Sequence, residues 1–396
     1  MAIDGARKGD VRAIDPSACV GCSVCNDVCP TDAIAMKPDE RGFLHPQISD
    51  ERCIGCGRCL RLCPVPDGAY RPAADAPLAC YAAYAKNDDI RYESTSGGLF
   101  TALADSVLDQ GGVVFGAAYG DCFVIRHEAA RSRSELGRLR QSKYAQSDKR
   151  GIYHEVKTLL KDGLPVLFAG CPCETYALQK YLGGQPDNLL IVDFLCLGVN
   201  SPQVFAEYLE ALAGKYHSEI KQVWFKNKEL GWNRFSTRVE FENGRVYRKD
   251  RDNDPYMRGY IVHPLYVRTS CTNCQYKAMP HPSDITLGDY WGVESVLPEV
   301  DTRDGVSVVF VNSERGAKLM TGAKGRLEFW EVSYEDTKTR QNSNAMTKSV
   351  VLDSRSASFY EDLRRYGFLE AIERNAPDPW LPKVKRLVKA LLGRTR

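Results

Sequence analysis

Eight cysteines near the N-terminus form two copies of one spacing. The copies are Cys19-x-x-Cys22-x-x-Cys25-x-x-x-Cys29-Pro30 and Cys53-x-x-Cys56-x-x-Cys59-x-x-x-Cys63-Pro64. The two copies are offset by the same 34 residues at every cysteine, which indicates an internal duplication. Three cysteines on a tight loop can bind three irons of a 4Fe–4S cubane, and in two-cluster ferredoxins the fourth ligand comes from the other copy.

This crossed pattern assigns the eight cysteines to two clusters. The first cluster would take Cys19, Cys22, Cys25 and Cys63, and the second would take Cys53, Cys56, Cys59 and Cys29. A zinc site would need only pairs of CxxC motifs, and a disulfide framework would not need this repeated spacing. The sequence therefore predicts a two-cluster ferredoxin-like domain at residues 1–68. A linker rich in Pro, Ala and Asp is predicted at residues 69–77.

Five further cysteines lie after predicted strands or in a later CxxC pair. Cys171 and Cys173 follow a predicted strand at 165–170, Cys196 follows another at 189–195, and Cys271 and Cys274 form the pair. The carboxyl ends of neighbouring parallel strands meet at one edge of a sheet, so the first three thiols are expected to face a common site. From spacing alone, three interpretations stay open: a third 4Fe–4S cluster, a redox-active disulfide, and zinc.

A short segment of hydroxyl residues and glycines, 94–100 (STSGGLF), leads into a predicted helix at 97–110. The first backbone N–H groups of a helix have no partner within the helix, so such a segment suits an anion. Its glycine spacing is neither that of a Walker loop nor that of a dinucleotide-binding fold. An ordinary capped helix after a turn is the alternative interpretation.

The order of the predicted elements indicates a mixed α/β to α+β domain at residues 78–380. Predicted strands at 78–85, 112–119, 165–170 and 189–195 alternate with helices at 97–110, 151–163, 174–184 and 201–214. This alternation favours a partly parallel sheet. After residue 219 the pattern changes to antiparallel strands with a hairpin at Asn243-Gly244. A strand at 306–313 and a helix at 355–374 follow.

Several ordered motifs between residues 80 and 300 are similar to those of a known family. They are STSGG, QSKYAQS, LFAGCPCETYALQKYL, DFLCLGVNSP, FKNKELGW and SCTNCQYKAMPHPSDITLGDYWG. In these motifs the chain resembles the coenzyme F-420 hydrogenase/dehydrogenase beta subunit family. The resemblance implies an FAD-binding iron–sulfur oxidoreductase with a further 4Fe–4S cluster close to the flavin.

The resemblance also implies roles for individual residues. It gives the third cluster the ligands Cys173, Cys196, Cys271 and Cys274, whereas Cys171 stands where relatives often have threonine. Nine residues become flavin-binding candidates: Ser96, Gly97, Gly98, Ser142, Lys143, Tyr144, Asp284, Thr286 and Gly288.

Three side chains are candidates for catalysis. Lys143 near the pyrimidine end of a flavin would stabilise the anionic reduced ring, although a surface lysine is the alternative. Lys277 and His281 flank the SDIT motif and could protonate a substrate at the flavin face.

The predicted function is electron transfer from reduced ferredoxin or another donor, through the clusters, to FAD. A flavin can accept single electrons and deliver them as a hydride, so FAD would reduce a small molecule or a glycan or secondary-metabolite intermediate. Two alternatives are a deazaflavin-coenzyme-dependent oxidoreductase and a non-catalytic relay subunit of a hydrogenase or dehydrogenase complex.

Composition limits the class of protein and the cellular compartment in which this chemistry is expected. The 396 residues carry 53 basic and 51 acidic side chains, and this net charge of +2 argues against a nucleic-acid binder. Neither a membrane-spanning run nor a secretory h-region is visible, so a cytoplasmic protein is predicted, with oligomerisation left open. Residues 381–396 predict a basic amphipathic helix, which would either bind the inner membrane surface or an acidic partner, or pack on the protein's own core.

Overall fold

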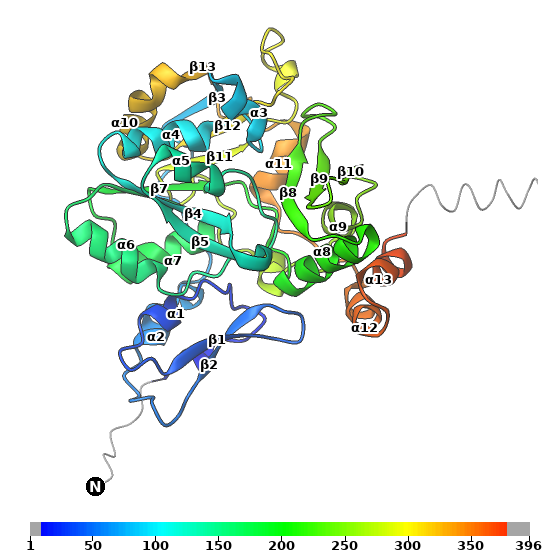
Figure 1. Cartoon of the computed structure of the whole chain (residues 1–396). Helices are drawn as coiled ribbons and strands as arrows, with labels where there is room; N and C mark the ends of the chain where they lie inside the picture. The colour runs from blue at the N-terminus through cyan, green and yellow to red at the C-terminus, as the bar shows by residue number, and fades with distance from the viewer. Residues whose placement is uncertain (1–8, 378–396) are drawn as a thin grey trace, which may run out of the picture.

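A computed structural model describes residues 9–377 of the chain (Figure 1). The predicted basic helix at 381–396 lies outside these residues. Within them, none of the helices combines the length and the apolar character that crossing a membrane requires.

The N-terminal part is a small ferredoxin-type unit below the large sheet in Figure 1. It consists of α1 (Val24–Asp27), β1 (Ile34–Pro38), β2 (Leu44–Ile48) and α2 (Arg58–Arg61), with β1 and β2 antiparallel. Both short helices begin after a residue with positive φ, Ser23 at 68° and Gly57 at 67°. Cys25 lies in α1 and Cys59 at the equivalent place in α2, so the two copies of the cysteine motif fold alike.

An eight-stranded mixed sheet dominates the rest of the chain. Its strands are β3 (Ala79–Ala85), β4 (Val113–Tyr119), β5 (Ile125–Ala130), β6 (Val166–Ala169), β7 (Leu189–Phe194), β11 (Ile285–Asp289), β12 (Ser307–Val311) and β13 (Leu327–Val332). Their order is β13-β3-β12-β11-β7-β6-β4-β5. The central strands β4, β6, β7 and β11 are parallel, and the outer strands pair antiparallel.

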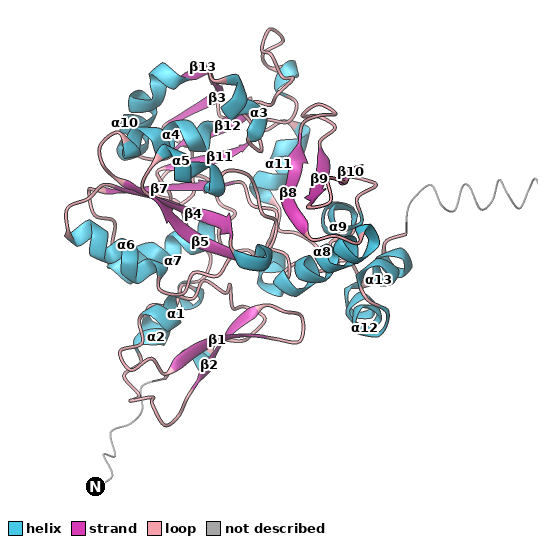
Figure 2. Ribbon diagram, in the orientation of Figure 1, coloured by secondary structure: helices cyan, strands magenta, loops and turns pink. Residues whose placement is uncertain are grey.

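Helices cover both faces of this sheet (Figure 2). They are α3 (Asp88–Glu93), α4 (Leu99–Leu108), α5 (Arg133–Leu136), α6 (Ile152–Lys161), α7 (Pro172–Leu182) and α10 (Glu314–Ala323). One apolar core packs α4, α5 and α10 on one face, and another packs α6 and α7 on the opposite face. The crossovers through α6 and α7 make β4, β6 and β7 parallel, which directs the carboxyl ends of these strands to one edge.

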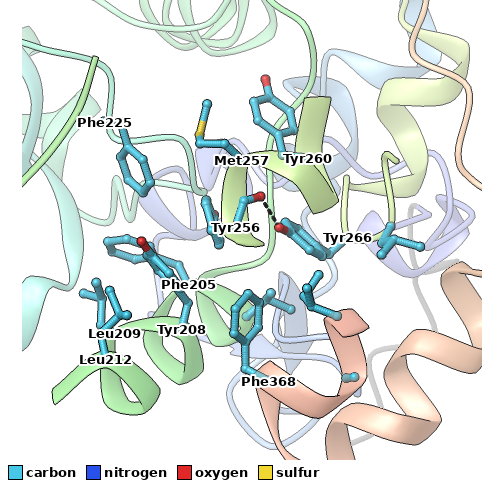
Figure 3. Close-up of a cluster of buried hydrophobic side chains, with 14 of the residues drawn as sticks. Phe205, Tyr208, Leu209, Leu212, Phe225, Tyr256, Met257, Tyr260, Tyr266 and Phe368 are labelled. Atoms are coloured by element: carbon cyan, nitrogen blue, oxygen red, sulfur yellow. Dashed lines mark hydrogen bonds between the residues drawn. The ribbon is translucent and has the colours of Figure 1, made fainter. Parts of the chain in front are cut away.

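A second, three-stranded sheet lies beside the large one. It has the order β10-β9-β8, with β8 (Ile220–Asn227), β9 (Ser236–Phe241) and β10 (Val246–Asp250). The accompanying helices are α8 (Pro202–Tyr216), α9 (Pro255–Met257), α11 (Arg340–Thr347), α12 (Ser356–Tyr366) and α13 (Phe368–Asn375). Figure 3 shows the aromatic core around α8, α9 and α13, in which Tyr256 stacks on Tyr208 and its backbone carbonyl accepts a hydrogen bond from Tyr266. In contrast, Met346 of α11 packs in a core of the large sheet.

The mixed sheet and the hairpin at Asn243-Gly244 confirm the fold predicted from the sequence. One predicted element is wrong. The helix expected at 355–374 is two helices, because Gly367 between α12 and α13 adopts φ +76° and breaks the helical path. The prediction also omitted β5 and β13, which extend the sheet at its two edges.

Candidate functional site

A cavity of about 370 Å³ lies inside the ferredoxin-type unit. Its lining includes all four cysteines predicted for the first cluster: Cys19, Cys22, Cys25 and Cys63. Burial and the neighbouring thiols raise the pKa of Cys25 well above its ordinary value, and burial raises the pKa of Cys22 to about 12. Cys22, Cys25 and Cys63 are buried and Cys19 is partly exposed. Buried, crowded thiols are stable as thiolates only beside a cation, so this donor set fits an iron–sulfur cluster.

Two of the cysteines predicted for the second cluster lie close together in this unit. Cys29 and Cys59 belong to one apolar cluster, and burial raises the pKa of Cys59. The Cys29 sulfur accepts a hydrogen bond from the backbone N–H of Ala33 at 3.2 Å. The grouping of Cys53 and Cys56 with these two stays a prediction.

The structure brings the five later cysteines together at the carboxyl ends of β6 and β7. Cys171 precedes α7, and its thiol donates a hydrogen bond to the Cys196 sulfur, which raises the pKa of Cys171 and lowers that of Cys196. Burial raises the pKa of Cys173, and the nearby thiols of Cys196, Cys274 and Cys271 raise it further.

This third group is compatible with a cubane. In the described part of the chain all the cysteines are free, and no three His, Cys, Asp or Glu side chains are grouped as ligands of one metal ion. A cubane does not need that grouping, because each of its four thiolates binds a different iron.

Tyr153, at the start of α6, connects the first and third cysteine groups. Its hydroxyl group lies 2.9 Å from the backbone carbonyl of Cys22 and 3.4 Å from that of Glu174, the neighbour of Cys173. The side chain is fully buried. The ferredoxin-type unit is therefore packed directly against the loop that carries the third group.

Buried polar side chains fix this packing. Arg268 donates hydrogen bonds to the backbone carbonyls of Cys19 at 2.6 Å and Leu44 at 3.1 Å. Gln146, from the predicted flavin-contact motif QSKYAQS, donates to the carbonyl of Gly21 at 3.2 Å. Gly21 has no room for a side chain, because a Cβ there would lie 2.1 Å from the Gln146 amide nitrogen.

Two of the predicted flavin-contact segments meet. The Thr95 hydroxyl accepts a hydrogen bond from the backbone N–H of Ser142 at 2.9 Å, and the two hydroxyl groups are 3.2 Å apart. Ser96 and Gly97 face inward instead, because the Ser96 hydroxyl donates to the carbonyl of Val306 and the Gly97 N–H donates to Ser307. Gly98 adopts φ +89° and precedes α4, whose first turn has no side-chain cap.

A cavity of about 470 Å³ opens beside this meeting point. Its lining carries four cations and three aromatic rings: Arg138, Arg140, Lys143, Lys221, Tyr119, Phe123 and Trp224. One acid, Glu93, also lines it and pairs with Arg140. The buried Lys143 ammonium donates to the carbonyls of Arg138, Arg140 and Gln141, and burial lowers its pKa to about 7. The indole N–H of Trp224 is buried and has no partner among the described residues. This lining fits an aromatic ligand that carries negative charge.

Tyr144 lies between this region and the third cysteine group. Its ring centroid is 5.6 Å from that of Tyr260, whose pKa is raised by burial and by the nearby Cys196 and Cys271 thiols. Tyr144 also adjoins the buried ion pair of Lys226 with Asp289. Burial alone would lower the pKa of Lys226, but Asp289 and Tyr144 raise it.

Sequence reasoning missed Lys226, Asp289 and the buried Lys149, which forms an ion pair with Glu174 at 2.7 Å. Lys226 lies within FKNKELGW and Asp289 ends β11 at the carboxyl edge of the sheet. A lysine inside the apolar strand pattern VWFKN was the available clue, because a buried lysine needs a nearby acid.

Asp284 and Thr286 lie away from this edge. Asp284 precedes β11, roughly 16 Å along the strand from Asp289 at about 3.3 Å per residue. Its carboxylate accepts hydrogen bonds from the Ile191 N–H and from Gln185, and pairs with Arg315 at 3.2 Å. Thr286 donates to Asp193 at 2.6 Å.

Gly288 packs against Leu195, and a Cβ there would lie 2.8 Å from that side chain.

The two remaining catalytic candidates also have protein partners. The Lys277 ammonium donates to the backbone carbonyls of Cys196 and Ala345, which places its charge beside the third cysteine group. His281 is buried, and its Nδ1 lies 3.1 Å from the carboxylate of Asp193.

Family models described as coenzyme F420 hydrogenase/dehydrogenase, beta subunit N-term and C terminus, match residues 80–149 and 164–336. The chain belongs to the coenzyme F420 hydrogenase/dehydrogenase beta subunit family. A 4Fe-4S dicluster domain model matches residues 18–66 of the same chain. It is thus an electron-transfer protein of the iron–sulfur oxidoreductase type.

One solved structure is also similar to this chain. One chain of the F420-reducing [NiFe] hydrogenase complex from Methanosarcina barkeri is 18% identical, with a TM-score of 0.49. The match covers 78% of this chain and 99% of that one. No curated protein matches.

Proposed function

We propose that the chain is a flavin-dependent iron–sulfur reductase. Electrons enter two 4Fe–4S clusters in a domain at residues 1–68, joined by a linker at 69–77 to an oxidoreductase domain at 78–380. A third cluster on Cys173, Cys196, Cys271 and Cys274 carries them to an FAD-binding site. A bound flavin exchanges single electrons with clusters and electron pairs with organic substrates.

The contact at Tyr153 carries this proposal. A single buried hydroxyl touches the backbone of Cys22 on one side and of the residue after Cys173 on the other. Electron carriers exchange electrons rapidly only over short distances, and this packing puts the first and third cysteine groups on opposite sides of one side chain. An electron-transfer chain needs that arrangement, whereas a ferredoxin tethered to an unrelated domain does not.

The basic cavity supports FAD as the cofactor. Lys143 and Trp224 line it, the Trp224 indole N–H has no partner within residues 9–377, and Gln141 and Lys143 belong to the motif QSKYAQS. Cationic side chains suit the phosphates of FAD, and aromatic side chains suit its rings. Tyr144 contacts Tyr260 beside Cys196, which gives a short connection from the cavity to the third cysteine group.

Reduced ferredoxin is the proposed donor, and the proposed substrate is a small organic molecule or a glycan intermediate. The test is anaerobic stopped-flow mixing of reduced ferredoxin with the full-length, FAD-loaded protein, followed at the flavin absorbance band. We expect the flavin to be reduced in the wild type. In Cys173→Ser the flavin should stay oxidised while the N-terminal clusters are still reduced.

Flavin reduction at the same rate in Cys173→Ser would contradict the proposed route through the third cluster. The same preparation distinguishes a reductase from a second candidate function, that of a relay subunit. If the wild type on its own reduces neither an organic substrate nor the deazaflavin coenzyme, but becomes active with a co-purifying hydrogenase or dehydrogenase, the chain is a relay subunit.

A further inference from the structure

Buried cations need compensation, because an unpaired charge in the protein interior is costly. Among the described residues, the buried cations are Arg91, Lys143, Lys149, Lys226, Lys228, Arg258 and Arg268. All but one of them are compensated in one of two ways: by an ion pair with a carboxylate or by a lowered pKa.

Four of these cations have a carboxylate partner. The pairs are Arg91 with Asp301, Lys149 with Glu174, Lys226 with Asp289 and Arg258 with Glu373. Two lysines reduce their charge instead, because burial lowers the pKa of Lys143 and of Lys228 to about 7.

Arg268 has neither form of compensation. It is 3% exposed, and no carboxylate in the described part of the chain forms an ion pair with it. A guanidinium group does not lose its proton in proteins. Its hydrogen bonds go to the carbonyls of Cys19 and Leu44, the amide oxygen of Gln146 and the His45 ring. The closest acid in this network, Asp39, contacts His45 and not the guanidinium.

The position of Arg268 indicates where its counter-charge lies. Its Nε is 2.6 Å from the carbonyl of Cys19 in the first group, and its own carbonyl accepts the N–H of Cys271 in the third group at 3.0 Å. The guanidinium lies against the first cysteine loop, because a Cβ on Gly21 would be 2.8 Å from its terminal nitrogen.

We propose that Arg268 is the shared counter-charge of the first and third clusters and sets the reduction potentials of both. The inference rests on the proposed function, because it requires the clusters. A 4Fe–4S cubane with four thiolates is anionic and gains a negative charge on reduction, and net charge is one determinant of its potential. A fixed cation close to such a group stabilises its reduced form. Within residues 9–377 the Arg268 side chain forms no hydrogen bond with Cys29, Cys53, Cys56 or Cys59, the proposed ligands of the second cluster.

The test is a redox titration of anaerobically purified full-length protein, followed by electron paramagnetic resonance. Arg268→Gln removes the charge, and Arg268→Lys keeps it with fewer hydrogen bonds. Arg258→Gln is the matched control, because Arg258 is equally buried but pairs with Glu373.

In Arg268→Gln we expect the first and third clusters to titrate at more negative potentials. Their oxidised-to-reduced ratio at the wild-type midpoint should rise at least about tenfold, which is 59 mV for one electron. The second cluster in this variant, and all clusters in Arg268→Lys and Arg258→Gln, should stay near the wild-type values. Unchanged potentials in Arg268→Gln, or equal shifts in Arg268→Lys, would overturn the proposal.

Iron loss gives an equally clear result. If Arg268→Gln binds no iron but Arg268→Lys is loaded normally, the charge is required to hold the clusters and the proposal stands. Loss of iron from both variants, with Arg258→Gln loaded, would show that packing and not charge is what Arg268 contributes. A wild type with about eight irons, two cubanes of four, contradicts the proposed function itself, and the first cluster alone still tests Arg268.

Discussion

The Tyr153 hydroxyl group donates a hydrogen bond to the backbone carbonyl of Cys22 at 2.9 Å. Tyr153 belongs to α6 of the large domain and Cys22 to the ferredoxin-type unit. The same hydroxyl lies 3.4 Å from the carbonyl of Glu174, one residue from Cys173. The Tyr153 hydroxyl thus links Cys22, a candidate ligand of the first cluster, to Glu174, which is bonded to Cys173, a candidate ligand of the third.

Tyr153→Phe removes this hydroxyl and keeps the buried ring. Because one buried hydrogen bond is lost, the free energy of unfolding should fall by about 1 kcal/mol. Electron transfer from the first to the third cluster should become slower, measured by rapid freeze-quench electron paramagnetic resonance. Tyr208→Phe is the control, since Tyr208 is fully buried and bonds to Asp254 outside the cysteine groups. Equal transfer rates in both variants would refute the role of the hydroxyl.

Single substitutions separate Cys171 from Cys173. Cys173→Ser should lower the iron content from about 12 to about 8 per chain, because one cubane of four irons is lost. Cys171→Ser should keep all the iron, because the proposed ligands of the third cluster are Cys173, Cys196, Cys271 and Cys274. The reverse pattern would make Cys171 the ligand.

The pKa of Lys143, lowered by burial to about 7, predicts a pH-dependent affinity for FAD. Below pH 7 the ammonium is charged in the free protein and attracts the anionic cofactor. Above pH 7 binding must take up a proton, so the affinity should fall by up to about tenfold per pH unit.

The measurement is the dissociation constant of FAD between pH 6 and 9, from flavin fluorescence. Lys143→Arg, whose charge does not titrate, should give a flat profile at the low-pH affinity. Lys143→Met should give a flat and weak profile. A wild-type affinity that is independent of pH would remove Lys143 from the site.

Asp284 offers a test of a residue that the family resemblance assigns to the flavin. Asp284→Asn should cost about 3 kcal/mol of unfolding free energy in urea, because the buried carboxylate loses its ion pair with the partly exposed Arg315 and the strength of its hydrogen bonds from Ile191 and Ser313. FAD content per folded chain should not change. Asp252→Asn, at the exposed ion pair with Arg251, is the control and should cost less. Loss of FAD from a stably folded Asp284→Asn would restore Asp284 to the flavin site.

The sequence was sufficient for features set by local spacing. The duplicated cysteine motif, the alternating strands and helices and the hairpin at Asn243-Gly244 are all encoded within short segments. The convergence of Cys171, Cys173 and Cys196 also followed from the sequence, because residues after neighbouring parallel strands share an edge.

Contacts between residues far apart in the chain could not be predicted from the sequence. Asp284 and Asp289 both lie in the motif SDITLGD, and only the strand between them determines which one reaches the carboxyl edge of the sheet. Arg268 contacts residues about 250 positions away in the sequence, so nothing near it distinguishes it from a surface arginine. The break at Gly367 was missed because the apolar pattern continues on both sides of it.

The most direct test of the account is the iron and flavin content of full-length protein purified without oxygen. Three cubanes and one flavin predict about 12 irons and about one FAD per chain. About 8 irons and no flavin would contradict the account, because the later cysteines and the basic cavity would then hold neither a cluster nor the cofactor.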